Sequence, residues 1–509
     1  MHVPRGTAAR IGLVPALCLV AWVAGCAGEA ERGSGTRPNV ILISIDGLRY
    51  DRTSLAGNVN DPTPSLSAFA EDAVQFPLSF SQSNESLLSH AALLTGRYAS
   101  EISRPDYETF IVDDGEMMLQ EILREYGFRT GAFVGGGHVK GVFGFDQGFD
   151  RFNETRADFG SLRESTMAAM AWIDSIPIGE PFFAFVHGYD CHRPYLHRGV
   201  FNHPFGQEYS GIADTIAHSR NDTERIYGKT YYPGLDFPRI WHAVGEKMLD
   251  PKIYQTDPQA FESLARGKPL PLSDTDLCHI LDHYDSGAFS ADTYVGFFLE
   301  WLEYGGVLNN TIVLITADHG EDLQTHGFSN HRAVLFDSTT RVPLLIGGGA
   351  VPRQWRGRVS DELVSAIDVV PTLCDAVGMR SPASQRGRSL WHAPGDAETD
   401  PPPVFQEGVL GQVSVRTARH RLTFAGPSLL DPDYLLQLIR EPVSCERIAL
   451  FDAVEDPDEQ LDIAYLEPEL ADSLRRELAE WRLGLEMSDD PGMVPPEEVR
   501  EALRERGYW

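Results

Sequence analysis

The 509-residue sequence has few cysteines and little positive charge, and each shortage excludes a class of protein. Beyond the N-terminal segment only Cys191, Cys278, Cys374 and Cys445 remain, and no two of them form a CxxC pair. Their spacing provides neither a zinc knuckle nor a disulfide framework, although it leaves room for one structural disulfide. The formal net charge of −31 argues against a nucleic-acid partner, because phosphate binding needs basic patches.

Long apolar runs are also missing, apart from one near the N-terminus. The run IGLVPALCLVAWVAG follows two arginines and is too short to span a membrane comfortably as a mature helix. It ends in VAGC at residues 23–26, which resembles a bacterial lipobox. The resemblance implies a signal peptide over residues 1–25, acylation of Cys26 and a flexible tether over residues 26–37. An ordinary signal peptide with an incidental cysteine is the alternative.

The lipobox has a consequence for location. An acylated Cys26 would anchor the protein to a membrane surface outside the cytoplasm, as a lipoprotein of the bacterial cell envelope. Ala27 follows the cysteine, where an acidic residue would signal retention. The resemblance therefore favours the outer membrane, with the body facing the periplasm or the cell surface.

From residue 38 onward, buried strands alternate with helices. Apolar runs without polar alternation predict strands over residues 38–46, 127–135, 181–189, 310–318 and 341–348. Helical patterns between them cover residues 64–74, 115–127, 163–176 and 291–306. This order predicts an α/β domain over residues 38–351 with a doubly wound, mainly parallel sheet. In such sheets ligands bind at the C-terminal ends of the strands.

Two later segments have a different composition. Residues 198–275 are rich in Tyr, Pro, His and Gly, which is typical of an inserted lid or specificity loop, with a surface excursion of no role as the alternative. Residues 352–509 predict a smaller C-terminal α+β domain. It contains a helix over residues 361–378, short strands and a charged helix over residues 468–484. The final residues, 495–509, predict a closing helix that packs on the body.

Acids and histidines follow several of the predicted strands. Those at or just past strand ends are Asp46, His187, Asp190, His192, Asp318 and His319. Because the carboxyl ends of parallel strands meet at one edge of a sheet, we expect these side chains to lie close together. A carboxylate beside an imidazole, as in Asp318 and His319, suits a divalent cation. Asp46 alone could instead cap a helix.

Five segments resemble, in order, the sulfatases of the alkaline phosphatase superfamily. They are PNVILISIDGLRYD, SLLSHAALLTGRY, FFAFVHGYDCHRPY, TADHGEDLQTHG and FDSTTRVPLLI. SAIDVVPTLCDAVG with GRSL, LFDAVEDPDEQLDIA and REALRERGYW extend the likeness, so that it covers roughly residues 38–509. Each motif is weak alone, but the ordered set is specific. The resemblance implies an alkaline phosphatase-like fold and a sulfuric ester hydrolase with one divalent cation. Calcium is the usual ion of the family, and magnesium, manganese and zinc remain alternatives.

The resemblance also assigns roles to residues of this chain. It implies metal ligands at Asp46, Asp318 and His319. It implies a nucleophile and catalytic histidines at Ser86, His90, His192 and His326, the last near the leaving group. Candidate substrate-binding residues are His187, His331 and Arg332. The cation would polarise the ester and lower the pKa of the nucleophile, while neutral histidines would donate to its oxygens and protonate the departing group.

The chain departs from the family pattern around the nucleophile. Where the family reads Cys/Ser-x-Pro-Ser-Arg, this chain has Leu88 and His90 in place of the Pro and the Arg. The signal for converting the first residue to formylglycine is therefore altered. Gly47 replaces a second acid, and the lysine usual after the Asp-His-Gly element is missing. A histidine at the His90 position resembles a sulfatase-like branch that reads Thr-x-Pro-Ser-His.

Three hypotheses for function follow. The first is a metal-dependent sulfatase-like hydrolase that cleaves small-molecule or glycan sulfate esters. The second is a phosphoester or phosphonate hydrolase, or a phosphotransferase, that uses unmodified Ser86, since a serine sulfate lacks the exit that a formylglycine hydrate provides. The third is a degenerate protein that binds anions without turnover, and the retained nucleophile and ligands oppose it. Ser86 could also be a helix N-cap, and a helix N-terminus stabilises a bound oxyanion.

Overall fold

The computed structural model describes most of the chain from residue 37 to residue 485. The described residues are 37–103, 111–154, 159–193, 195, 204–205, 209, 273–326, 331–332, 335–391, 401–408, 412–425 and 448–485. Cys26, the predicted signal peptide, nearly all of the tether and of the 198–275 segment, Cys445 and the predicted closing helix lie outside them. Within the described residues, every helix is too short or too polar to cross a bilayer. The domain limits drawn from the sequence remain predictions.

The strands of the described residues form three sheets. The largest contains β1 (Asn39–Ile45), β2 (Val74–Gln75), β4 (Arg129–Val134), β5 (Arg151–Glu154), β6 (Phe182–Gly188), β7 (Thr311–Thr316), β8 (Leu344–Gly347) and β9 (Arg358–Val359). A small parallel pair joins β3 (Ser79–Phe80) to β10 (Val364–Ser365). A four-stranded antiparallel sheet contains β11 (Val404–Glu407), β12 (Gln412–Arg416), β13 (His420–Ala425) and β14 (Ile448–Asp452).

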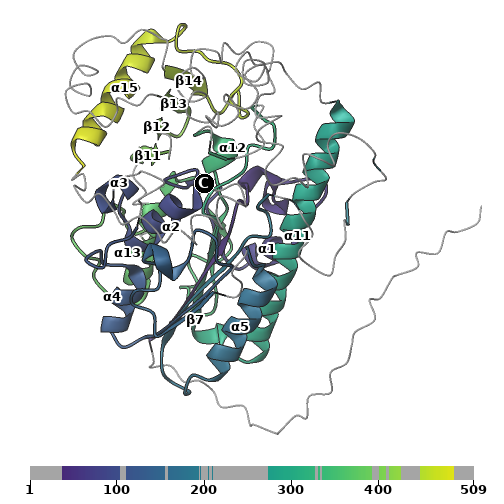
Figure 1. Ribbon diagram of the computed structural model, residues 1–509, viewed down its shortest axis with the longest axis vertical. Helices are drawn as coiled ribbons and strands as arrows, with labels where there is room; N and C mark the ends of the chain where they lie inside the picture. Colours follow the sequence, from purple (N-terminus) through teal and green to yellow (C-terminus); the bar gives the residue numbers. More distant parts are fainter. Residues whose placement is uncertain are drawn as a thin grey trace, which may run out of the picture.

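Helices cover both faces of the largest sheet (Figure 1). The described α-helices are α1 (Pro64–Ala70), α2 (Ser86–Thr95), α3 (Ala99–Ile102), α4 (Leu119–Glu125), α5 (Leu162–Asp174), α11 (Asp274–Tyr304), α12 (Asp337–Thr340), α13 (Val369–Ala376) and α15 (Pro468–Leu483). Helices α1, α5 and α11 lie on one side of the sheet, and α2, α4 and α13 lie on the other. The predicted α/β architecture with a covered sheet is confirmed.

The largest sheet is parallel at its centre. Its strand order is β5-β4-β6-β1-β7-β8-β2-β9, and β1 runs parallel to both β6 and β7. Ser44 of β1 lies opposite His187 on one side and Thr316 on the other. The run predicted over residues 341–348 forms β8, which is antiparallel to β7. Because β1 has a parallel neighbour on each side, the ends of β1, β6 and β7 lie at one edge.

The side chains of β1 alternate between two cores. Val40 and Leu42 belong to the apolar cluster that contains residues of α2, α4 and α13. Ile41, Ile43 and Ile45 belong to the cluster that contains residues of α5 and α11. Burying one such side chain stabilises the fold by roughly 1.5–3 kcal/mol. The continuous apolar run is therefore explained by a strand that is covered on both faces.

Two predicted helices have different limits in the structure. Helix α11 begins at Asp274, well before residue 291, and Ser273 caps it by accepting the N–H of Asp276 at 3.2 Å. Its first residues are exposed or half-buried, and the buried stretch that begins at His279 contains many polar residues, so the apolar pattern of a helix is weak there. The helix predicted over residues 361–378 is wrong at its start, because β10 and a 3-10 turn precede α13. Pro371 has no N–H and fits only in the first turn of a helix.

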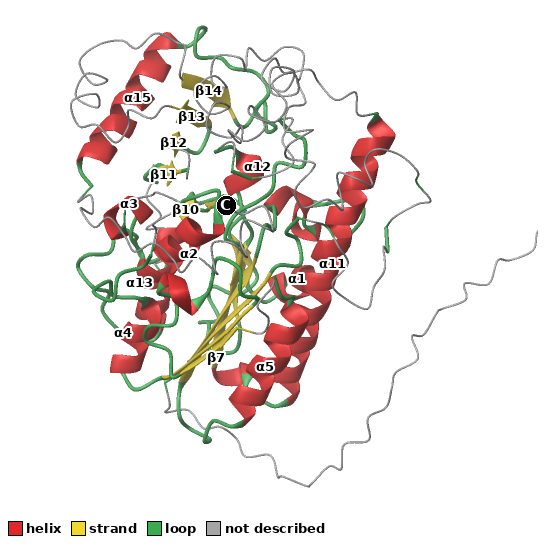
Figure 2. Ribbon diagram, viewed as in Figure 1, coloured by secondary structure: helices red, strands yellow, loops and turns green. Residues whose placement is uncertain are grey.

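A smaller body lies beside the end of the main sheet where α12 is found (Figure 2). It consists of the antiparallel sheet and α15, whose Leu474 and Leu478 pack with Val415, Leu422 and other residues of the sheet. These strands and the helix confirm the predicted α+β arrangement.

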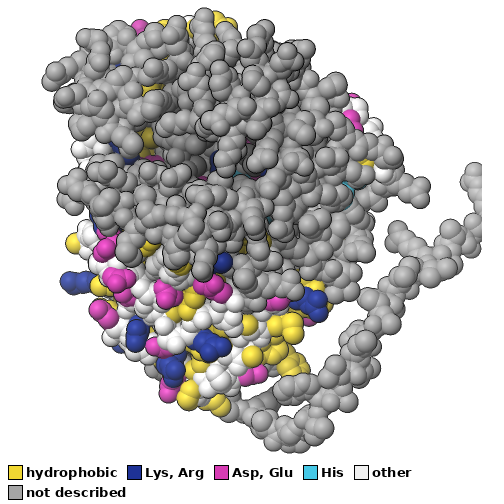
Figure 3. All heavy atoms as spheres, viewed as in Figure 1, with side chains coloured by type: hydrophobic (Ala, Val, Ile, Leu, Met, Phe, Trp, Pro, Cys, Tyr) yellow, Lys and Arg dark blue, Asp and Glu magenta, His cyan; other side chains and the backbone are white. Residues whose placement is uncertain are grey.

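The surface carries charges of both signs. Where described residues reach the face shown in Figure 3, acidic, basic and apolar side chains are interspersed. Within the described part of this face, no broad patch of one sign is visible.

Candidate active site

Asp46 and Asp318 meet at the edge of the main sheet. Asp46 follows β1, and its N–H donates to the carbonyl of Gly188 at the end of β6 at 3.0 Å. Gly47 then turns the chain in a left-handed conformation (φ 71°), and its N–H donates to Oδ1 of Asp318 at 3.1 Å. Neighbouring strand ends therefore bring together two carboxylates that are distant in sequence. Both are buried.

Ser86 is the first residue of α2, and its hydroxyl faces these carboxylates. Glu85 is the N-cap, and its carboxylate accepts the N–H of Leu87 at 2.9 Å. The interpretation of Ser86 as the N-cap is therefore wrong. Its Oγ lies 3.0 Å from Oδ2 of Asp46 and 3.1 Å from Nε2 of His319.

Ser89 lies one turn further along α2 and has other partners. Its hydroxyl donates to the carbonyl of Ser83 at 2.9 Å and accepts from the hydroxyl of Ser81 at 3.0 Å. Both partners belong to the segment that precedes α2. Of these two serines of α2, Ser86 is the one that contacts Asp46.

The donor atoms around Ser86 fit a divalent cation. One ligand atom from each of Asp46, Asp318 and His319 lies within 4.8 Å of the others. Oδ1 of Asp46 and Oδ2 of Asp318 are buried and have no hydrogen-bond partner among the described residues. Nδ1 of His319 donates to the carbonyl of Gly320 at 2.8 Å, so its Nε2 carries the lone pair. Burial and the nearby Asp318 carboxylate raise the pKa of Asp46, and a cation between the two acids would offset that repulsion.

His90 supports this site from the second turn of α2. Its Nδ1 donates to the carbonyl of Ser86 at 2.8 Å, and its Nε2 accepts from the hydroxyl of Ser44 at 3.0 Å. The same Nδ1 lies 3.6 Å from Oδ2 of Asp318. Burial lowers the pKa of His90, which keeps the imidazole neutral. His90 therefore contacts the backbone of Ser86 and lies near Asp318, and both of its nitrogens are engaged.

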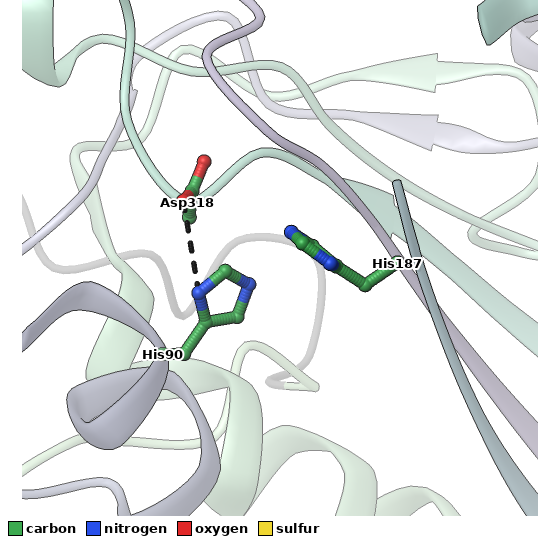
Figure 4. Close-up of side chains that lie close together, drawn as sticks. All are labelled: His90, His187 and Asp318. Atoms are coloured by element: carbon green, nitrogen blue, oxygen red, sulfur yellow. Dashed lines mark ion pairs between the residues drawn. The ribbon is translucent and has the colours of Figure 1, made fainter. Parts of the chain in front are cut away.

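His187 approaches the same acids from β6. Figure 4 shows His90, His187 and Asp318 converging from α2, β6 and the segment after β7. A ring nitrogen of His187 lies 3.7 Å from Oδ2 of Asp46, and its ring meets that of His90 edge-on at 4.8 Å. Neither ring nitrogen has a hydrogen-bond partner among the described residues. Burial lowers the pKa of His187 well below its ordinary value.

His331 and His192 extend the site on the other side of His319. The ring of His331 lies 4.1 Å from that of His319, and its Nδ1 lies 3.2 Å from Oε1 of Glu321. Burial and the neighbouring His319 lower the pKa of His331. The ring of His192 lies 5.4 Å from that of His331 and stacks on Phe159 at 5.7 Å. The structure thus places both predicted histidines in one row of rings that begins at His319.

His326 and Arg332 lie further out. Nδ1 of His326 lies 2.7 Å from Oδ1 of Asp322, and its Nε2 donates to the carbonyl of Asp458 at 2.8 Å. Its hydrogen bonds therefore tie the main domain to the small one and do not include Ser86. Arg332 lies 3.8 Å from Oε1 of Glu85, with a fifth of its side chain exposed (20%).

Three further residues at the site were not singled out in the sequence. Glu85 caps α2 and also lies 2.9 Å from Nδ1 of His138, which follows β4. Glu321 orients His331. The sequence could have indicated His138, because it follows a strand as the other candidate histidines do. It could also have indicated Glu321, which lies within the TADHGED motif. Glu85 carried no such signal, because its role depends on where α2 begins.

Comparisons with known proteins identify the family of the chain. The family model described as Sulfatase matches residues 38–379. The chain is 24% identical over 386 residues to an arylsulfatase of Clostridium perfringens, covering 70% of this chain and 78% of that protein. It is 25% identical over 548 residues to the N-sulphoglucosamine sulphohydrolase of Homo sapiens, covering 96% of each.

Two solved structures show the same fold. One is an enzyme in complex with its substrate D-glucosamine-2-N,6-O-disulfate, with a TM-score of 0.64 and 19% identity over 90% of this chain and 99% of that one. The other is a phosphonate monoester hydrolase of Agrobacterium radiobacter, with a TM-score of 0.63 and 19% identity over 88% and 95% of the two chains. At this level of identity the likeness shows the fold alone.

Proposed function

The chain belongs to the sulfatase family, a family of sulfuric ester hydrolases in the alkaline phosphatase superfamily, and we propose that it cleaves sulfate esters with Ser86 as the nucleophile. The observation that carries the proposal is the position of the Ser86 hydroxyl, 3.0 Å from Asp46 and 3.1 Å from His319. A serine between a carboxylate and the lone pair of an imidazole is placed for activation.

One divalent cation would be held by Asp46, Asp318 and His319. The two buried carboxylate oxygens without partners, together with the lone pair on Nε2 of His319, supply the donor atoms. When bound, such an ion polarises the ester oxygens and lowers the pKa of a nearby hydroxyl. The metal requirement is part of the proposal.

In the first half-reaction, Ser86 Oγ attacks the sulfur of the ester. The hydroxyl already donates to Oδ2 of Asp46, so this oxygen receives the proton as the O–S bond forms. The bond between sulfur and the ester oxygen breaks, and its electron pair leaves with that oxygen. His192, which packs edge-on against His331, is the group proposed to supply the leaving group's proton.

In the second half-reaction, water releases sulfate from Ser86. His331 is suited to act as the base, because its Nδ1 donates to Glu321 and its Nε2 has no hydrogen-bond partner among the described residues. A carboxylate that fixes the tautomer of an imidazole is the arrangement found in general-base pairs. Attack of the activated water on sulfur breaks its bond to Ser86, and Oγ takes back the proton held by Oδ2 of Asp46. Sulfate leaves, and the proton taken up by His331 exchanges through solvent to restore the one that His192 gave to the leaving group.

Phosphonate or phosphate ester hydrolysis is the second candidate. Two observations favour it: His90 and Leu88 replace the residues of the formylglycine signal, and phosphonate monoester hydrolases are among the proteins with the same fold. The same Ser86, acids and histidines would act on phosphorus. For the sulfate activity, the substrate class supported by the relatives is a sulfated sugar, since one structural neighbour holds a disulfated glucosamine.

The test compares aryl esters that share one leaving group: a sulfate, a phosphonate monoester and a phosphodiester. Each is assayed with the wild type and with Ser86→Ala, before and after removal of divalent ions. The proposal predicts that the sulfate is turned over fastest and that both the substitution and the chelator abolish turnover. Faster turnover of a phosphorus ester would establish the second candidate. A folded protein that binds sulfate and turns over none of the three would establish an anion-binding role without catalysis.

For location, we propose a lipid-anchored protein of the bacterial envelope, acylated at Cys26. The lipobox-like VAGC sequence at residues 23–26 supports it. Incorporation of a labelled fatty acid in a Gram-negative host tests it, with Cys26→Ser as the variant and Cys18→Ser as the matched control. The label should be lost in Cys26→Ser and kept in Cys18→Ser. A soluble, unlabelled mature wild-type protein would contradict the anchor.

A further inference from the structure

His187 is a buried imidazole for which the reaction above gives no role. It lies within β6, opposite Ser44 of β1, and its side chain is fully buried. Neither of its ring nitrogens has a hydrogen-bond partner among the described residues. A buried polar group without a partner costs free energy, so such groups are rare in folded proteins. The position therefore calls for a ligand.

Two acids that lie near His187 also have unpartnered oxygen atoms. Oδ1 of Asp46 and Oδ2 of Asp318 also lack partners among the described residues. A ring nitrogen of His187 lies 3.7 Å from the Asp46 carboxylate, and ligand atoms of His187 and Asp318 lie within 4.8 Å of each other. Two ligands of one tetrahedral ion lie roughly 3.3–3.6 Å apart when each bond is about 2.0–2.2 Å. The 3.7 Å separation between His187 and Asp46 is close to that of two ligands of a shared ion.

His90 is the other imidazole near Asp318, and its bonds set it apart. Its Nδ1 donates to the carbonyl of Ser86, and its Nε2 accepts from Ser44. Ligation through His90 would break one of these two bonds. Its 3.6 Å approach to Oδ2 of Asp318 suits a residue that positions the acid. His187 has no such bond to lose.

We propose that His187 is a ligand of the cation that Asp46, Asp318 and His319 hold, which makes the site one of two carboxylates and two imidazoles. A site with this donor set selects a transition-metal ion of intermediate softness, such as Zn²⁺ or Mn²⁺, over Ca²⁺. Imidazole suits zinc and its neighbours, whereas Ca²⁺ takes six to eight oxygen ligands. The inference rests on the proposed metal site, and it replaces both the calcium expected from the family and the substrate-binding role expected for His187.

Metal binding, measured without substrate, tests the inference. The full chain is stripped of metal and titrated with Co²⁺, Zn²⁺ and Ca²⁺, and the visible absorption of bound Co²⁺ reports its ligands. The variants are His187→Leu, which removes the donor, and His187→Cys, which replaces it with a thiolate. His420→Gln, on the small sheet, is the matched control. Circular dichroism of each stripped protein establishes that it is folded.

The wild type and the control should bind one Co²⁺ or Zn²⁺ far more tightly than Ca²⁺. His187→Leu should weaken Zn²⁺ binding by about 100-fold or more, since losing even an outer partner of a ligand costs roughly 10–100-fold. His187→Cys should restore tight Zn²⁺ binding and add a sulfur-to-cobalt absorption band. Equal affinity for Ca²⁺ and Zn²⁺ would overturn the inference. So would an unchanged cobalt spectrum in His187→Leu with a raised KM, which would make His187 a substrate contact.

The assignment of His187 as a ligand and the proposed hydrolase activity can fail independently of each other. Ester hydrolysis that depends on Ser86 could persist with Ca²⁺ bound, in which case only the ligand assignment fails. Tight Zn²⁺ binding without turnover of any ester would leave the ligand assignment standing and overturn the hydrolase.

Discussion

The hydroxyl of Ser86 donates to Oδ2 of Asp46 across 3.0 Å, although 40 positions separate the two residues in the chain. One residue ends the central strand of the main sheet and the other begins α2. The proposed active site therefore forms where the end of a strand meets the start of a helix. The role of each of its residues can be measured by substitution.

Substituting Ser86 separates it from its neighbour Ser89. Ser86→Ala should lower kcat by about 10³-fold or more, because it removes the group that forms the covalent bond. Ser89→Ala, the matched control, removes a hydroxyl whose bonds go to Ser83 and Ser81, and should change kcat little. Steady-state kinetics on one aryl ester measures both. Comparable losses in the two variants would mean that the hydroxyls act through the fold of the α2 N-terminus.

Glu321 should act by holding His331. Glu321→Gln should lower kcat roughly 10–100-fold and move the acid limb of the pH–rate profile, since the tautomer and basicity of His331 depend on that carboxylate. Glu321→Asp should restore part of the rate. Asp322→Asn is the control, because Asp322 pairs with His326 instead. It should leave the shape of the profile unchanged, and an unchanged profile in Glu321→Gln would remove Glu321 from the reaction.

The small domain should depend on one buried arginine. Arg421 on β13 is fully buried and bonds Asp337 of α12 at 2.6 Å and Glu459 at 2.7 Å. Arg421→Met should lower the free energy of unfolding by about 3–5 kcal/mol, because it leaves Glu459 buried without this partner and Asp337 with Arg416 alone. Urea unfolding followed by circular dichroism measures this loss.

Arg419, which directly precedes β13, offers a control. It pairs with Asp452 at the surface, where solvent screens the interaction. Arg419→Met should therefore leave the urea midpoint almost unchanged. Equal effects of the two substitutions would show that the buried network contributes no more than the exposed pair.

Asp292 should make stability fall as the pH rises. It accepts the N–H groups of Ser65 and Leu66 at the start of α1, and burial raises its pKa to about 6 from 3.8. Between these two values the folded state holds a proton that the unfolded state has lost, so folding weakens as the pH rises through this window. Relative to Asp292→Asn, the wild type should lose up to about 3 kcal/mol between pH 4 and pH 7.

The opposite slope is expected at Asp452. Burial there is slight, and the hydrogen bond from Arg419 lowers its pKa. The advantage of the wild type over Asp452→Asn should therefore grow as the pH rises from the folded-state pKa to the ordinary value. Urea unfolding at several pH values measures both pairs. If the difference in free energy of unfolding between wild type and Asp292→Asn is the same at every pH, the raised pKa of Asp292 is refuted.

Much of the fold and the centre of the site could be predicted from the sequence, for a physical reason. A strand buried on both faces must be apolar along its whole length, so β1, β6 and β7 stand out, and the polar residue that ends each one marks the sheet edge. Asp46, His187 and Asp318 follow from that rule. Ser86 and His90 required the resemblance to the sulfatases, since nothing in the apolar period of α2 distinguishes them.

What could not be predicted depended on contacts made after folding. His326 lies in the same motif region as Asp318, yet its two nitrogens bond Asp322 and the small domain. Glu85 became visible as a cap only once the start of α2 was known. Pro371, by contrast, could have placed the start of α13, because a proline belongs in the first turn.

The most direct test of the central claim is the mass of the peptide that carries Ser86, after the protein is mixed with substrate and quenched in acid. The account predicts that a fraction of this peptide gains the mass of one sulfuryl or phosphoryl group, that fragmentation places it on residue 86, and that the peptide of Ser89→Ala gains it equally. A protein that turns over substrate while the group is found on another residue, or that keeps its full rate as Ser86→Ala, would contradict it.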